Sequence, residues 1–199
     1  MKKFKLTSEF IVDISGVKLF RIKALIEFGN VKAGDLGGYI EKEENLSHMG
    51  NAWVSGNAQV SGDARVSGDA RVSGNAWVSG NAQVSGDARV SGDARVSGNA
   101  QVSGDARVSG NARVSGDAQV FGDARVSGDK DYAYAHGFGS CNRTTTFFRL
   151  KDGDVGVRCG CFYGTLAQFR DNVCETHGET KKAQEYLMLA DLMDFRFKN

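Results

Sequence analysis

Apolar and polar positions recur with a period of six residues through the middle of the chain. Thirteen consecutive copies of the unit [N/D]-A-x-V-S-G run from Asn51 to Gly128, and Phe121 is the single break in the serine column. Alanine and valine are two residues apart, so on an extended segment they point to one face and the residue between them points to the other. The Ser-Gly-[Asn/Asp] that follows is typical of a corner, because Gly, and less readily Asn and Asp, accept a positive φ. The pattern predicts an all-β solenoid of short strands with Ala and Val inside.

The repeats resemble the hexapeptide-repeat proteins of bacteria, whose fold is a left-handed parallel β-helix with three hexads in each triangular coil. The resemblance implies about four to five coils and, because such coils stack every eighteen residues, three outward ladders of side chains. These ladders are Trp53, Arg71, Arg89, Arg107 and Arg125; Gln59, Trp77, Arg95 and Arg113; and Arg65, Gln83, Gln101 and Gln119.

Residues 51–74 recur without change as residues 75–98. This duplication is four hexads long, which is not a multiple of three, so it moves identical hexads to a different face. We therefore expect Trp53 and Trp77 to lie on different sides. A binding surface on one face would be scrambled by such a step, which favours a shaft whose length matters more than its faces.

The residues before the repeats, 1–44, predict a β cap and an irregular first winding. An alternating pattern in Val17–Phe28 predicts a strand, which the turn at Asp13–Gly16 pairs with Phe10–Val12. The winding is expected to start near Gly38, and residues 45–50 to form a degenerate hexad in phase with the shaft, which itself extends over residues 45–128. The cap would protect the open edge of the first coil.

Residues 129–199 predict a small ββαα module of the α+β class. Strands over Thr144–Leu150 and Val155–Cys161 flank a turn, which indicates a hairpin. Helices are expected from Thr165, in a capping box with Gln168, to about Thr176, and from about Thr180 to Asp194. The flanks on both sides of the shaft resemble segments of uncharacterised bacterial and phage proteins, which implies a phage or prophage origin.

Composition and charge exclude several classes of function. The net charge is +1 and the shaft is neutral, so bulk electrostatics do not predict nucleic-acid binding. We predict no membrane span and no signal peptide, because no long apolar run occurs. Four cysteines, all in the last 70 or so residues, fit a cytoplasmic protein with reduced, buried thiols.

The candidate sites lie mainly outside the shaft. The segment 131–148 predicts an irregular loop that binds a small anionic molecule or a protein partner, or that serves only as a polar connector; its candidate residues are His136, Asn142, Arg143, Thr144, Thr145 and Thr146. Trp53 and Trp77, facing outward, are candidate subunit contacts, and the resemblance implies a homotrimer, with a monomer as the main alternative. A zinc site is a weaker alternative to buried thiols, with candidate ligands Cys141, Cys159, Cys161, Cys174 and His177. We expect no metal and no cofactor.

The resemblance makes acyltransferase the obvious enzymatic reading, but those enzymes use a histidine base at the coil surface, and the thirteen hexads contain none. The sequence also disfavours two other uses of a solenoid. Hexapeptide carbonic anhydrases need three histidines and ice-binding solenoids need ranks of threonine, and the thirteen hexads contain neither residue. We predict a non-enzymatic structural or interaction protein, a rigid shaft that presents a C-terminal binding module. The alternative is a phage factor that captures a host protein or signalling molecule.

Overall fold

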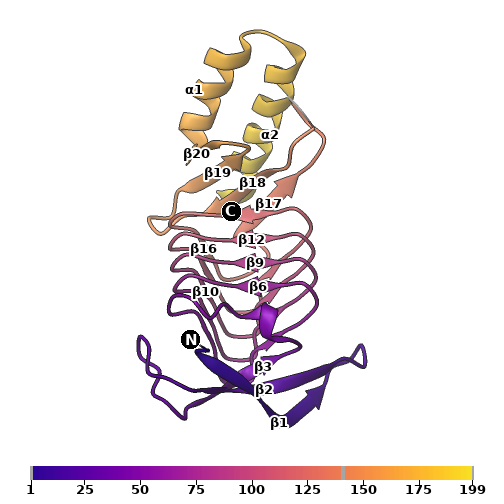
Figure 1. Cartoon of the computed structure of the whole chain (residues 1–199). Coiled ribbons are helices and arrows are strands. Elements are labelled where there is room, and N and C mark those ends of the chain that lie inside the picture. The colour runs from indigo at the N-terminus through magenta and orange to yellow at the C-terminus, as the bar shows by residue number, and fades with distance from the viewer. Residues whose placement is uncertain (1, 140–141, 199) are drawn as a thin grey trace.

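The protein is a shaft of stacked coils with a different structure on each end (Figure 1). The computed structural model describes residues 2–139 and 142–198. An antiparallel cap closes the N-terminal end, and a four-stranded sheet with two helices closes the other end. The solenoid and the α+β module at its C-terminal end are therefore as predicted.

The shaft consists of two-residue strands that form three parallel sheets, one on each face. Each strand pairs with the strands eighteen residues away, as in Arg89 with Arg71 and with Arg107. The three faces consist of β4 (Trp53–Val54), β7 (Arg71–Val72), β10 (Arg89–Val90), β13 (Arg107–Val108) and β16 (Arg125–Val126); of β5 (Gln59–Val60), β8 (Trp77–Val78), β11 (Arg95–Val96) and β14 (Arg113–Val114); and of β6 (Arg65–Val66), β9 (Gln83–Val84), β12 (Gln101–Val102) and β15 (Gln119–Val120). The three ladders expected from the repeat are confirmed.

The interior of the shaft is a column of alanine and valine side chains that are essentially inaccessible to solvent. Backbone hydrogen bonds join consecutive coils, for example from Arg89 N–H to the Ala106 oxygen at 2.9 Å. At the corners glycine lies on glycine: a Cβ on Gly68 (φ +68°) would lie 2.9 Å from the Gly86 nitrogen. Only glycine fits both the positive φ and this close approach, so the glycine column sets the coil-to-coil stacking.

The N-terminal cap is an antiparallel extension of one shaft face. It consists of β1 (Phe4–Val12), β2 (Lys18–Ala24), β3 (Leu36–Ile40) and a short 3-10 helix, η1 (Glu43–Asn45), and β3 pairs in parallel with β5. The predicted hairpin turn at Asp13–Gly16 is confirmed. The prediction that the second strand continues to Phe28 was wrong: the strand ends at Ala24, the chain bends at Leu25 and Ile26, and Phe28 pairs with Val31 across a separate turn at Gly29, where φ is 51°.

The expected phase of the first winding was also wrong. Ile40 pairs with Val60 and Leu46 with Val66, a separation of twenty residues, whereas Val60 pairs with Val78 at the regular eighteen. The corner between Leu46 and Ala52 therefore holds two more residues than a regular corner. Residues 45–50 wind with the shaft, but they are not in phase with it.

Side chains replace missing backbone donors at the open end of the first coil. The Lys3 ammonium donates to the Ala52 oxygen at 2.8 Å and to the Gly50 oxygen at 3.3 Å, and the Asn45 amide donates to the Gly62 and Ala64 oxygens at 3.0 and 2.9 Å. Lys3 is buried, and this burial lowers its pKa to about 8, although the Asp69 carboxylate nearby acts in the opposite direction. The cap thus satisfies carbonyls that a preceding coil would otherwise satisfy.

Among its described residues, the C-terminal module has four strands where two were predicted. They are β17 (Tyr132–Ala135), β18 (Thr145–Arg149), β19 (Val155–Cys159) and β20 (Phe162–Thr165), in one antiparallel sheet of that order. The helices α1 (Leu166–His177) and α2 (Lys181–Phe197) follow; α1 begins with the predicted Thr165–Gln168 capping box and ends at Gly178. Neither of these described helices is long and apolar enough to cross a membrane.

Candidate functional site

The residues predicted to form a binding loop are divided between the protein interior and its surface. Thr145 and Thr146 lie buried in β18, where Thr146 Oγ1 accepts from the Gln119 N–H at 2.9 Å and Thr145 Oγ1 donates to Cys159 Sγ at 3.2 Å. These two hydroxyls face the interior. Thr146 supplies an acceptor for a backbone N–H of the last coil of the shaft. The segment is thus partly strand, since Tyr132–Ala135 pairs with β18.

The other loop candidates lie at the surface. His136 is exposed, and its Nδ1 lies 2.9 Å from the Thr144 hydroxyl; Asn142 and Arg143 are exposed as well. The structure brings His136 and Thr144 together, and a role for them in binding stays a prediction.

The two tryptophans have different surroundings. Trp53 is 7% exposed, because Phe28 of the N-terminal cap packs edge-on against its ring at 5.4 Å between centroids. Trp53 lies on the outward side of its strand as expected, but the cap covers its ring, so the expectation that it is exposed as a subunit contact is wrong. Trp77 is half-buried, and the Arg95 guanidinium lies over its ring at 5.6 Å.

The expectation of buried thiols is wrong for the three described cysteines. Cys159 is half-buried, but Cys161 and Cys174 are exposed, and Cys141 lies outside the described residues. Cys161 does not continue the inward face of β19, because Gly160 takes a φ of 59° and turns the chain into β20. Within the described residues, no three His, Cys, Asp or Glu side chains are grouped so that they could hold a metal ion.

The module is joined to the shaft through Phe121, the one residue that breaks the serine column. Its ring packs edge-on against Tyr163 of β20 at 5.2 Å, and the Arg158 guanidinium lies 5.1 Å from the Phe121 centroid. A Cβ on Gly122 would collide with the Tyr163 hydroxyl. The break in the repeat therefore marks the place where the module packs against the shaft. The phenylalanine in place of serine is the feature of the sequence that indicates this contact.

Asp131 fixes the chain as it leaves the shaft. Its carboxylate accepts hydrogen bonds from the Ser127 N–H at 2.8 Å, the Ser127 hydroxyl at 2.6 Å and the Gly128 N–H at 3.1 Å. Burial raises the pKa of this carboxyl, but the hydrogen bonds outweigh burial and hold the pKa below its usual value.

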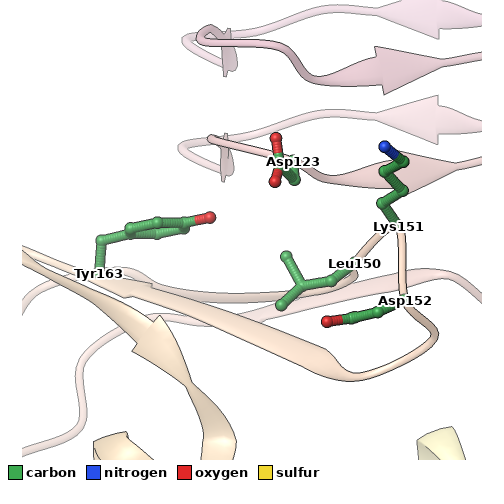
Figure 2. A pocket seen from close by; sticks show the side chains of 5 residues that line it. All are labelled: Asp123, Leu150, Lys151, Asp152 and Tyr163. Carbon is green, nitrogen blue, oxygen red and sulfur yellow. The ribbon is translucent and has the colours of Figure 1, made fainter.

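A hollow of about 380 Å³ lies at this junction (Figure 2). Its lining comes from the last shaft corner, from the β18–β19 turn and from β20: Asp123, Leu150, Lys151, Asp152 and Tyr163. It adjoins a second hollow of about 310 Å³ along the arginine ladder, with Asp123 and Lys151 common to both. No described arginine of this ladder lies within 4.0 Å of a carboxylate oxygen, yet the Asp and Arg rows line the same hollow. The surface is charged but balanced, which does not select a ligand of either sign.

An exposed apolar row on α2, which we call the α2 stripe, consists of Met188, Leu192 and Phe195. These side chains are 64%, 56% and 71% exposed. Residues at this spacing share one face of a helix, and the face that packs on the sheet carries other residues, among them Ala190 and Met193. The α2 stripe was missed, although the apolar residues of the sequence MLADLMDF, 188–195, can be divided between two opposite faces.

A second exposed apolar row, which we call the hairpin row, lies at the other end of the molecule. It consists of Phe10, Val12 and Ile14, at alternate positions of β1 and its turn, all exposed. β1 is also the edge strand of its sheet. The shaft between these two rows has polar or charged residues at its outward positions, apart from the two tryptophans.

One comparison with known families matches the shaft. The YdcK Beta solenoid repeat matches residues 58–71, 64–80, 70–86, 82–98, 88–104 and 100–116. No curated protein matches the chain. The matched segments lie within the three-sheet shaft and agree with its six-residue period. The chain is a β-solenoid repeat protein.

Proposed function

We propose that the protein is a non-catalytic spacer, whose rigid shaft holds two interaction surfaces apart at a fixed distance and angle. The observation that carries this proposal is the distribution of exposed large apolar side chains: among the described residues none lies within the thirteen hexads, and they include the hairpin row at one end and the α2 stripe at the other. Contiguous exposed apolar residues mark interaction sites more often than single ones do.

The regularity of the shaft supports a role in spacing. Its coils have the same inward residues and the same strand pairing. Each added coil therefore lengthens the shaft by roughly 4.8 Å and leaves the backbone structure of its three faces unchanged. The duplication of residues 51–74 altered which face carries each outward residue and left the coil structure intact. A protein that uses one face of its shaft would not tolerate this rotation as readily.

The surroundings of the histidines support the non-enzymatic part of the proposal. His48 stacks on Phe4 at 4.3 Å, and its Nδ1 accepts from the Lys3 N–H. His177 stacks on Tyr186 at 5.8 Å. Two of the three histidines thus pack against aromatic rings, and only His136 is in a position to act as an exposed base.

The finer assignment within this proposal is a phage or prophage protein that acts in the host cytoplasm on a protein partner. It is supported by the resemblance of both flanks of the shaft to segments of bacterial and phage proteins. Neither nucleic acid nor a membrane is a proposed partner, since the net charge is +1 and the charges of the shaft balance.

Capture of partners from a bacterial lysate on immobilised protein, followed by mass spectrometry, tests the proposal. We expect Val12→Lys with Ile14→Lys, or Met188→Glu with Leu192→Glu, to lose proteins that the wild type captures. Arg89→Gln and Gln101→Lys, outward on the shaft, are the matched controls and should capture them normally. Loss of capture in the shaft variants, with both end variants unaffected, would place the site on the shaft and contradict the proposal.

A further inference from the structure

We propose that the α2 stripe packs against the α2 stripe of a second copy, in an antiparallel pair with two-fold symmetry. This inference rests on the proposed function, because it assigns a partner to one of the two end surfaces. The stripe lies on the side of α2 opposite the residues that pack on the module, so α2 is apolar on two faces. A helix that is apolar on both sides is typical of one buried on both sides.

The position of α2 leaves room for such a pair. The two helices form the end of the molecule, beyond the four-stranded sheet and away from the shaft (Figure 1). Two molecules that meet there would extend their shafts away from each other. A C2 interface brings the same patch from both copies together, so it requires a self-complementary surface.

The charges on one flank of the stripe meet this requirement. Glu185 and Arg196 are about three helical turns apart and so lie on the same flank. In an antiparallel pair, Glu185 of each copy can lie opposite Arg196 of the other, and the same register sets Leu192 beside Met188 of the second copy. Neither Glu185 nor Arg196 forms an ion pair within residues 2–139 and 142–198. The Glu185 carboxylate accepts a hydrogen bond from the Gly139 N–H, and the Arg196 guanidinium donates one to the Asp129 backbone oxygen.

The other flank of the α2 stripe is compatible with the pairing. It carries Asp191 and Asp194, and like charges would meet there across the two-fold axis. Each carboxylate already has a cation of its own chain, because Arg170 lies 2.7 Å from Asp191 and Lys198 lies 2.7 Å from Asp194. These ion pairs within each chain reduce the repulsion between the two flanks.

The consequence is a bivalent spacer. Two shafts joined at their C-terminal modules would present one hairpin row at each outer end. Any partner of the hairpin row would then be bound twice, at a separation set by the number of coils in both shafts.

Light scattering coupled to size exclusion, on the full chain at micromolar concentration, tests the pairing. We expect a mass near twice that of the 21.4 kDa chain. Leu192→Glu should return the mass to one chain with an unchanged circular dichroism spectrum. Met49→Glu is the matched control, because it also adds a charge at an exposed apolar residue. Met49 is 80% exposed and lies in the N-terminal region, so this variant should stay dimeric.

A charge exchange tests the register. Glu185→Arg or Arg196→Glu alone places like charges opposite each other twice and should weaken the dimer by about tenfold. The double variant Glu185→Arg with Arg196→Glu restores opposite charges and should regain the wild-type dissociation constant. A double variant that remains as weak as the single ones overturns this register.

Three results overturn the pairing itself: a wild-type mass of one chain, a mass of three chains, or a dimer that persists in Leu192→Glu. The proposed function fails separately, by the capture experiment. A monomeric wild type whose captured proteins are lost in Met188→Glu with Leu192→Glu would leave the spacer standing, with another protein on the α2 stripe.

Discussion

Residues 51–74 and residues 75–98 have the same sequence and the same backbone, but they differ in what surrounds them. In both copies the Ala and Val side chains are buried, and each hexad gives a two-residue strand followed by a glycine corner. The equivalent glycines, Gly56 and Gly80, have φ values of 65° and 68°. The six residues of the unit therefore determine the coil, wherever the unit stands in the shaft.

The difference between the copies comes from the N-terminal cap. Trp53 is covered by Phe28, whereas the equivalent Trp77 is half-buried beneath Arg95. The Ala52 oxygen accepts from the Lys3 ammonium, whereas the Ala76 oxygen accepts from the Gln59 N–H of the preceding coil. The repeat therefore encodes the coil locally, while the role of each outward residue depends on distant segments.

The largest effect is expected where the two copies are equal. Val66→Asp and Val90→Asp, at equivalent positions, each place an unpaired carboxylate in the Ala/Val interior and should cost several kcal/mol of unfolding free energy. Arg65→Gln and Arg89→Gln, on the same strands but outward, should stay within about 0.5 kcal/mol. Thermal melting of the four variants checks this, and equal melting temperatures within each Arg/Val pair would contradict the assigned faces.

The next effect should separate the copies. Trp53→Ala removes a ring buried against Phe28 and should cost about 3–5 kcal/mol. Trp77→Ala removes a half-buried ring and a surface cation–π contact, so it should cost about 1 kcal/mol. Urea unfolding measures both; a larger loss for Trp77→Ala would show that the cap does not cover Trp53 in solution.

A smaller effect is expected from the capping lysine. Lys3→Met removes the donor for the Gly50 and Ala52 oxygens and should cost about 1–3 kcal/mol, because two carbonyls stay unsatisfied at the open end. Hydrogen exchange should show that the loss concentrates in the first copy, and a uniform loss in both copies would contradict a local capping role.

The same lysine should make stability depend on pH. The folded pKa of Lys3 is about 8, against an ordinary value of 10.5, so the unfolded chain binds more protons between these values. Stability should therefore rise as the pH increases from about 8 to 10.5, through this group. Comparison of wild type with Lys3→Met across this window isolates the contribution. A difference between the two proteins that does not grow with pH would refute the lowered pKa.

The smallest change in stability is expected from removing a whole coil. Deletion of residues 75–92 removes three hexads, which lie away from both caps. It should leave a folded protein with both ends in the same angular relation. Deletion of residues 75–80 alone should also fold, but with the C-terminal module rotated by a third of a turn. Loss of soluble protein in both deletions would show that the hexads are not interchangeable.

The sequence predicted the shaft in detail and the ends only in outline. A period of six with a fixed glycine identifies inward residues, corners and ladders, because each depends on residues within one unit or eighteen positions away. The strand Tyr132–Ala135 was missed because its glycine-rich flank resembles a loop and its partner is β18, farther along the chain. The repeat does not predict the burial of Trp53, because the residue that covers it, Phe28, belongs to a segment outside the repeat. The α2 stripe was not predicted because one apolar face, which includes Ala190 and Met193, is enough to indicate an amphipathic helix.

We propose that interchangeable coils set the distance between the two ends. Pulsed electron paramagnetic resonance between spin labels at Lys32 and Lys151 measures this distance directly, in a variant whose four cysteines are replaced by serine and which is diluted with unlabelled protein. Inserting a second copy of residues 75–92 should lengthen the distance by roughly 4.8 Å, and inserting two copies by twice that amount, with no change in the width of the distribution. An unchanged distance, or a distribution that broadens with each insertion, would contradict a rigid shaft of interchangeable coils.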